Sequence, residues 1–185
     1  MREGNLFKSF SRLDKYEREL TIFFFKGLFY DASKIVIFFL LFSLFNMTTY
    51  FWYSLLYLIL FRSSSGGIHC NSYLGCLTIS LLVLSISIIL GIYVFIPILH
   101  QTIFTILLGI ITVFFSPVLS SSRPNPGPSI IKRAKIRSSI CIFVLIVLLT
   151  IYPKTIFSNI GFWSLVIHTF QLFIAHLRRW YHVFI

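Results

Sequence analysis

Residues 77–119 read LTISLLVLSISIILGIYVFIPILHQTIFTILLGIITVFFSPVL and contain no Lys, Arg, Asp or Glu. A helix that spans a membrane needs about 20 apolar residues, so this stretch is long enough for two spans. Pro97 lies between its halves, and proline favours a helix boundary. We therefore expect one span over about residues 77–96 and a second over 98–119.

Two more apolar tracts flank this stretch. Residues 35–61 are interrupted at Asn46–Thr49, and residues 140–177 are broken at Pro153-Lys154, so that the second tract predicts two spans, the first of them short. The chain is 57% apolar and 11% charged, whereas soluble domains lie nearer half apolar and a quarter charged. This composition excludes a soluble enzyme, a secreted disulfide scaffold and a disordered tail. It predicts an all-α polytopic membrane protein with about six membrane helices.

The charges predict how the chain crosses the bilayer. Residues 1–34 hold seven bases and all five acids, whereas residues 35–185 hold nine bases and no acid. A net charge of +11 is also typical of nucleic-acid binding, but these bases flank apolar runs, which favours membrane orientation and no nucleic-acid partner. The positive-inside rule places residues 120–139 in the cytoplasm. It places the basic C-terminus of residues 140–185, with Arg178 and Arg179, on the same side.

Counting spans back from that loop makes residues 62–76 cytoplasmic, and the basic N-terminus is expected on the same side. Residues 32–61 must then enter and leave on one side, as a helical hairpin bent near Asn46–Thr49. Each arm has about a dozen apolar residues, about 18 Å of helix, which is short for a full crossing. Either the arms borrow residues from both flanks or the hairpin is re-entrant.

The two polar segments have their own predictions. Residues 1–31 carry Leu6, Phe10, Leu13 and Leu20 at helical spacing, which indicates an amphipathic helix on the membrane surface or packed on the protein. Residues 120–139 hold three prolines and a glycine, which predicts a loop. That loop is either a linker or a basic binding site for an acidic peptide. The site would consist of Arg123, Lys132, Arg133, Lys135 and Arg137. We identify no signal peptide, and three cysteines make no disulfide framework.

The chemistry is expected in residues 62–76, RSSSGGIHCNSYLGC. Gly66 and Gly67 allow a tight bend, and Asn71 or Ser72 suits the N-cap of the helix that follows. Cys76 then lies near a helix N-terminus, where the dipole favours the nucleophilic thiolate. His69 is a candidate base for its proton.

This dyad demands a helix that starts after His69, because seven helical residues would separate the two side chains by about 10.5 Å. Cys70 is an alternative nucleophile, and His69, Cys70 and Cys76 together are alternative ligands for a soft metal. The same residues also fit an ordinary membrane boundary. The histidines at positions 100, 168, 176 and 182 show no partner motif, and we expect boundary or snorkelling residues there.

Gly66-Gly67-Ile68-His69-Cys70, with Cys76 seven residues after the histidine and Arg62 before the glycines, resembles the accessory gene regulator B (AgrB) family. The six segments and the basic proline-containing loop resemble it too. The family consists of bacterial membrane cysteine endopeptidases of quorum sensing. The resemblance implies that His69 and Cys76 are catalytic and that Arg62 and Gly67 are needed for activity. Cys70 matches no catalytic position.

The resemblance also implies a substrate, an AgrD-like precursor peptide with an amphipathic leader and an acidic C-terminal part. The enzyme would cleave the precursor, hold an acyl-thioester on Cys76 and release a cyclic thiolactone. It would need no cofactor and would form a homodimer in the bacterial cell membrane. Whether Asn71, a serine or an N-terminal acid orients His69 stays open. The rival interpretation is a non-enzymatic transporter or scaffold.

Overall fold

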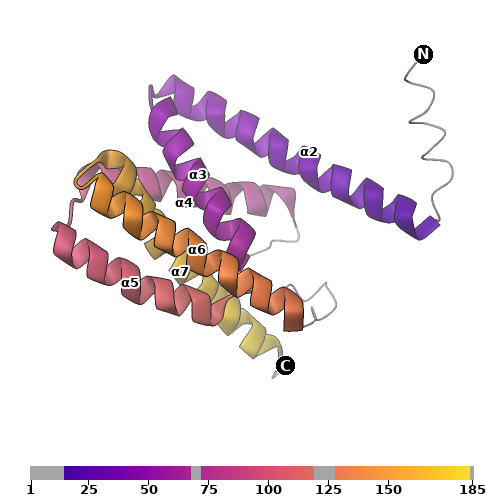
Figure 1. The fold of residues 1–185 in the computed structure, drawn as a ribbon. Helices are drawn as coiled ribbons and strands as arrows, with labels where there is room; N and C mark the ends of the chain where they lie inside the picture. Colours follow the sequence, from indigo (N-terminus) through magenta and orange to yellow (C-terminus); the bar gives the residue numbers. More distant parts are fainter. Residues whose placement is uncertain (1–14, 68–71, 119–127, 184–185) are drawn as a thin grey trace, which may run out of the picture. The chain divides into compact units, whose positions relative to one another are not determined.

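The computed structural model describes residues 15–67, 72–118 and 128–183, and all its regular elements there are helices (Figure 1). They are α2 (Lys15–Leu44), α3 (Thr48–Ser65), α4 (Tyr73–Tyr93), α5 (Ile98–Phe115), α6 (Pro128–Ile151) and α7 (Ile156–Val183). The chain divides into two compact units, residues 1–44 and 45–185. The all-α prediction is confirmed.

Five of the described helices are long and apolar enough to cross a membrane. The candidate spans are Gly27–Leu44, Tyr73–Tyr93, Ile98–Phe115, Ile131–Ile151 and Ile156–Leu177. Helix α3 has 18 residues but falls outside this set, and it ends in the polar run Arg62–Ser65. The chain is therefore a multi-pass helical membrane protein.

In the first unit, α2 runs without a break through residues 31 and 32, where the sequence analysis divided a surface helix from the hairpin. The division is absent because nothing interrupts the helix there, and the Lys34 ammonium pairs with the Asp31 carboxylate at 2.8 Å, three residues away. The candidate span in this helix begins at Gly27, eight residues before the apolar tract recognised in the sequence.

The chain leaves α2 at Leu44 and begins α3 at Thr48, within the segment where the sequence predicted a bend. Asn46 has a φ of 55°, a left-handed conformation that asparagine adopts more readily than most residues. The predicted break therefore coincides with a real interruption of the helix.

In the second unit, α7 packs against each of the helices α3, α4, α5 and α6 (Figure 1). One buried cluster lies between α3, α6 and α7 and consists of Tyr57, Phe61, Leu145, Leu149, Ile160 and Leu165. Two glycines allow close packing: a Cβ on Gly161 would lie 2.5 Å from the Tyr57 ring, and one on Gly91 would lie 2.9 Å from the Ile160 Cα. Gly91 therefore lets α4 approach the backbone of α7, and Gly161 of α7 leaves room for the Tyr57 ring of α3.

Helix α6 begins at Pro128, so residues 128–139 are helical and the predicted loop over 120–139 is wrong in this part. Proline is tolerated in the first helical turn because its missing N–H needs no partner there. The candidate span over Ile131–Ile151 is consequently full-length and not short. The break predicted at Pro153-Lys154 is confirmed, with Lys154 at a φ of 63°.

Hydrogen bonds show which helix ends lie together. At one end the Val118 N–H donates to the Ser65 carbonyl at 3.1 Å, and the Ser116 and Ser138 hydroxyls are 3.1 Å apart. We call this the Arg62 end, after the cation in the last turn of α3. At the opposite end, Asn159 donates to the carbonyls of Gly91 and Val94, each at 2.8 Å.

Candidate functional site

The end of α3 is fixed at Gly66. Its φ of 81° lies in the left-handed region that side chains disfavour, and its N–H donates to the Arg62 carbonyl at 3.1 Å. A Cβ there would lie 3.1 Å from the Val118 carbonyl oxygen. A Cβ on Gly67 would lie 3.1 Å from the Arg62 Nε. The glycine pair therefore lets the chain turn while backbone and guanidinium approach closely.

Helix α4 begins at Tyr73, and Ser72 is its N-cap, with a hydroxyl that accepts from the Gly75 N–H at 3.1 Å. The Cys76 N–H donates to the Ser72 carbonyl at 3.1 Å, which closes the first turn. Cys76 thus lies in the first turn of α4. Of the two predicted N-caps, the structure uses Ser72.

The predicted turn over 62–76 is shorter than expected. Residues 62–65 continue α3 and residues 73–76 already belong to α4, because a serine cap lets the second helix start early. His69, Cys70 and Asn71 lie outside the described residues, so their roles stay predictions. The helix does start after His69, as the dyad demands. Within the described segments no three His, Cys, Asp or Glu side chains gather as for a metal.

Arg62 crosses from α3 to α4. Its guanidinium Nη1 donates to the Ser80 hydroxyl at 3.1 Å. Ser80 follows Cys76 by four residues, so the two side chains lie on the same face of α4, one turn apart. The structure thus brings Arg62 to the face of α4 that carries the candidate nucleophile.

His168 is a residue whose position the sequence analysis missed. We expected a boundary residue, yet its side chain is 1% exposed and stacks on Phe61 with ring centroids 5.7 Å apart. Its Nε2 is within hydrogen-bond distance of the Ser65 hydroxyl, which is fully buried. A useful signal was present, because an ionisable residue inside an apolar span is by default a functional candidate.

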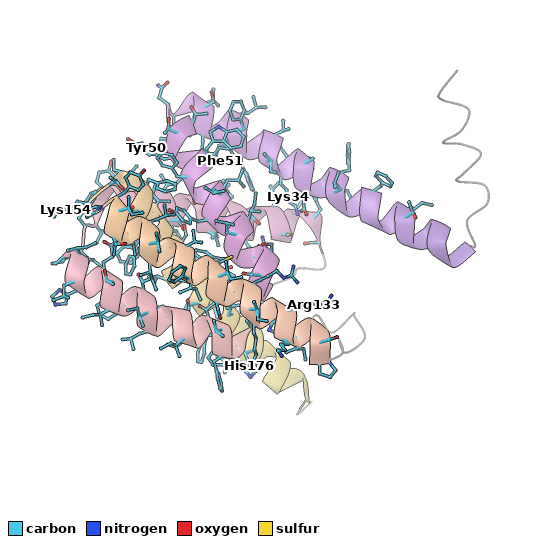
Figure 2. The ribbon with its side chains drawn as sticks, in the orientation of Figure 1. Lys34, Tyr50, Phe51, Arg133, Lys154 and His176 are labelled. Carbon is cyan, nitrogen blue, oxygen red and sulfur yellow. The ribbon has the colours of Figure 1, made fainter. Side chains whose placement is uncertain are left out.

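The basic residues of 128–139 lie on two flanks of α6. The Cys141 thiol donates to the Leu60 carbonyl at 3.6 Å, which places that flank against α3. Arg137 and Arg133 precede Cys141 by one and two turns and share this flank. Figure 2 shows Arg133 near one end of α6 and Lys154 beyond the other. Arg123 lies outside the described residues.

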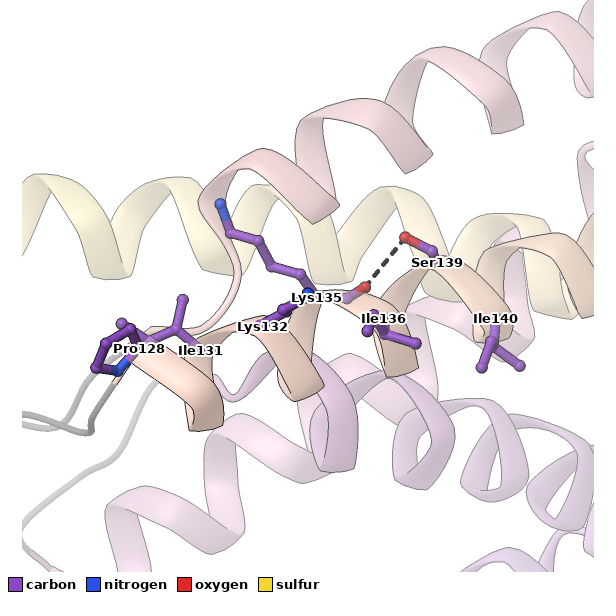
Figure 3. Close-up of a pocket in the computed structure, with 7 residues that line it drawn as sticks. All are labelled: Pro128, Ile131, Lys132, Lys135, Ile136, Ser139 and Ile140. Atoms are coloured by element: carbon purple, nitrogen blue, oxygen red, sulfur yellow. Dashed lines mark hydrogen bonds between the residues drawn. The ribbon is translucent and has the colours of Figure 1, made fainter.

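Lys132 and Lys135 lie on the other flank and line a groove on α6 (Figure 3). Its other lining residues are Pro128, Ile131, Ile136, Ser139 and Ile140. Lys135 and Ile131 also line an adjoining cavity that reaches Phe114 of α5 and His176 of α7. The four described bases of the predicted set are therefore not one patch: Arg133 and Arg137 lie on one flank of α6, and Lys132 and Lys135 lie on the other.

Taken together, these features define a multi-pass helical membrane protein with a polar corner at the Arg62 end of its bundle. This corner consists of Arg62, Ser65, the pair Gly66-Gly67 and the capped start of α4 at Ser72, which carries Cys76 in its first turn. Comparison with known families is consistent with this class. The sequence profile of accessory gene regulator B matches residues 4–172, and the chain belongs to this family.

A curated relative adds detail. The chain is 37% identical over 105 residues to a putative AgrB-like protein of Clostridium beijerinckii. The match covers 55% of this chain and 52% of that protein, so the chain spans about half the length of the curated relative it matches. No solved structure matches this chain.

Proposed function

We propose that this chain is a membrane cysteine endopeptidase that processes a quorum-sensing precursor peptide of the AgrD type. The observation that carries the proposal is the start of α4 at Ser72–Tyr73, which puts Cys76 in the first turn of a helix after the glycine bend. Family membership supports the same reaction class. A helix through residues 66–76 would have argued against it.

The first chemical step is amide cleavage. His69 takes the proton of the Cys76 thiol, and the thiolate attacks one peptide carbonyl of the precursor. The protonated imidazole then gives its proton to the departing amine, so the C-terminal fragment leaves with a new N-terminus. The N-terminal part stays on Cys76 as an acyl-thioester.

The second step closes the ring. The thiol of a cysteine within the bound precursor loses its proton to the imidazole and attacks the thioester carbonyl. A thiolactone forms, and the Cys76 thiolate leaves and regains a proton. Because this nucleophile is tethered, its effective concentration is high, and exclusion of water prevents hydrolysis to a linear product.

Arg62 has a part in this scheme. The bond to Ser80 holds its guanidinium on the Cys76 face of α4, and a cation there stabilises the negative charge of the tetrahedral oxyanion. The other oxyanion donors are assigned to backbone amides that precede Gly75, because the Gly75 and Cys76 amides already donate to Ser72. Gly67 is needed because a side chain there would press on the Arg62 Nε.

We assign recognition of an acidic precursor segment to the bases of α6. Arg133 and Arg137 lie on the flank next to α3, whose last turn carries Arg62, and Lys132 and Lys135 line the groove of Figure 3. Neutralising Arg133 and Arg137 together should raise KM at low salt, with less effect at high salt. Lys154→Gln, beyond the opposite end of α6, is the control. An unchanged KM at low salt contradicts this assignment.

The proposed topology has both termini and the corner in the cytoplasm. In the second unit, the described cations gather at the Arg62 end, on Arg62 and the first turns of α6, whereas Lys154 lies beyond the other end of α6. This asymmetry is what the positive-inside rule requires of a cytoplasmic end. A homodimer is part of the proposal, and light scattering of the detergent-solubilised protein tests it.

Co-expression with a candidate precursor from the same genome, followed by mass spectrometry of the peptides, tests the activity. Wild type should yield a cleaved peptide that has lost one further water, relative to the linear fragment, on ring closure. Cys76→Ala and His69→Ala should yield neither, and Cys70→Ala should retain both. Processing that survives in Cys76→Ala but is lost in Cys70→Ala moves the nucleophile to Cys70. Equal processing in all variants refutes the cysteine mechanism.

A further inference from the structure

We propose that His168 is a positioning residue of the site: its Nε2–H holds Ser65, and through Ser65 the corner that carries Arg62 and the glycine pair. This inference rests on the proposed function, because it concerns the same site. It adds a residue from α7, about a hundred positions away in the sequence, to a site otherwise built from α3 and α4.

The hydrogen bonds of Ser65 determine which atom donates. The Ser65 hydroxyl lies 2.6 Å from the Phe61 carbonyl oxygen. A carbonyl has no proton to give, so the single proton of the hydroxyl is used in that bond. The short contact with His168 therefore requires a proton on Nε2, with the Ser65 oxygen as acceptor. The imidazole donates and the serine accepts.

The other ring nitrogen makes no comparable contact. His168 Nδ1 is buried and has no hydrogen-bond partner among the described residues. The ring otherwise contacts Phe61, which belongs to the same last turns of α3 as Ser65. The directed interaction of His168 within the described structure is thus with the C-terminal end of α3.

Ser65 is where three parts of the bundle meet. Its side chain binds α7 through His168, and its carbonyl accepts from the Val118 N–H after α5. The next residue is Gly66, whose N–H donates to the Arg62 carbonyl one turn back. A shift of Ser65 must therefore move the glycine bend and the turn that aims Arg62 at Ser80 and the Cys76 face.

Two substitutions of His168 separate the donor from the ring. Glutamine has an amide nitrogen the same number of bonds from Cα as Nε2, whereas the asparagine amide corresponds to Nδ1. Both variants lose the stacking on Phe61, so a difference between them reports the bond to Ser65. Ser65→Ala removes the acceptor and provides the matched test from the other side.

The first readout is precursor processing by the full chain in proteoliposomes. His168→Asn and Ser65→Ala should each lower kcat about tenfold, which is what the loss of one good hydrogen bond amounts to. KM should change less than twofold, since the bases of α6 are untouched. His168→Gln should keep most of kcat. The double variant Ser65→Ala/His168→Asn should be no worse than either single one, because both remove the same bond.

The second readout needs no precursor. The rate of iodoacetamide labelling at Cys76, followed by mass spectrometry against pH, reports the thiolate in folded protein. In His168→Asn the labelling rate should fall below that of wild type at each pH, and in His168→Gln it should match wild type. A loss of fold alone lowers the yield of both variants without separating their profiles.

Equal kcat or equal labelling profiles for the Gln and Asn variants overturn the inference, whether the shared value is high or low. So does a Ser65→Ala variant with wild-type values. Failure of the proposed function gives a different result: no processing by wild type, or processing that survives Cys76→Ala. The labelling profiles still test the interaction in that case.

Discussion

Gly91→Ala should destabilise the bundle although alanine is the better helix former. Gly91 lies on the buried face of α4 and meets the backbone of α7. An added Cβ would lie 2.4 Å from the Ile160 Cγ1, 2.9 Å from its Cα and 3.1 Å from its N. The side-chain carbon can rotate away, but the two backbone atoms cannot.

The size of the effect follows from these distances. Ordinary van der Waals separation begins at 3.4 Å, so the 2.9 Å between the added Cβ and the Ile160 backbone requires the helices to separate by about 0.5 Å. Such overpacking costs about 1–3 kcal/mol. The separation also weakens the 2.8 Å bond from Asn159 to the Gly91 carbonyl, by about 1 kcal/mol. The gain in helix propensity returns about 1 kcal/mol. The net loss is about 2 kcal/mol, or about 4–8 °C in Tm.

Thermal unfolding in detergent, followed by tryptophan fluorescence, measures this loss. Trp163 is a local reporter, since its indole donates to the Val94 carbonyl at 3.0 Å, next to the same helix crossing. Gly27→Ala is the matched control, because its Cβ would meet no atom within 4 Å and the propensity gain is the same. Its Tm should stay level or rise. A Tm of Gly91→Ala at or above wild type would refute the reasoning.

Three further predictions concern the corner and the opposite end. Gly66→Ala should cost about 1–2 kcal/mol, because of the positive φ, and should abolish processing; full processing at an unchanged Tm would contradict this. Ser72→Ala should cost about 1 kcal/mol and speed hydrogen exchange at the amides of residues 73–76, whereas Ser72→Asp should restore protection. Asn159→Leu should cost about 2–3 kcal/mol through its lost bonds to Gly91, Val94 and Gln101, read as a lower Tm.

Some errors of the sequence analysis have a common physical origin. The predicted ends of segments followed charge and proline, but helices extend past such residues where their backbone groups are satisfied. Pro128 begins α6 because it needs no N–H partner there, and Ser72 starts α4 before the apolar run begins. Local composition indicates which residues of a helix are apolar, but the backbone hydrogen bonds determine where the helix begins and ends.

The candidate site was likewise predictable only in its local features. The glycine pair and the spacing to Cys76 were visible in the sequence because they are local and depend on backbone geometry and a helix start. The position of His168 was not, because its partner Ser65 lies more than a hundred residues away and no local pattern links them. The division of the α6 bases between two flanks could not be predicted either. Only the packing of α6 against α3 and α5 shows that its arginines and its lysines lie on different flanks.

The sequence by itself determined that this chain is helical and crosses a membrane, because apolar length and scarcity of charge act residue by residue. It also placed the bend at Asn46 and the break at Pro153-Lys154, where backbone preferences decide. The tertiary structure decided what meets at the Arg62 end. Arg62 with Ser80, Ser65 with His168 and Ser65 with Val118 are pairs from separate segments, and only the packing around α7 brings them together.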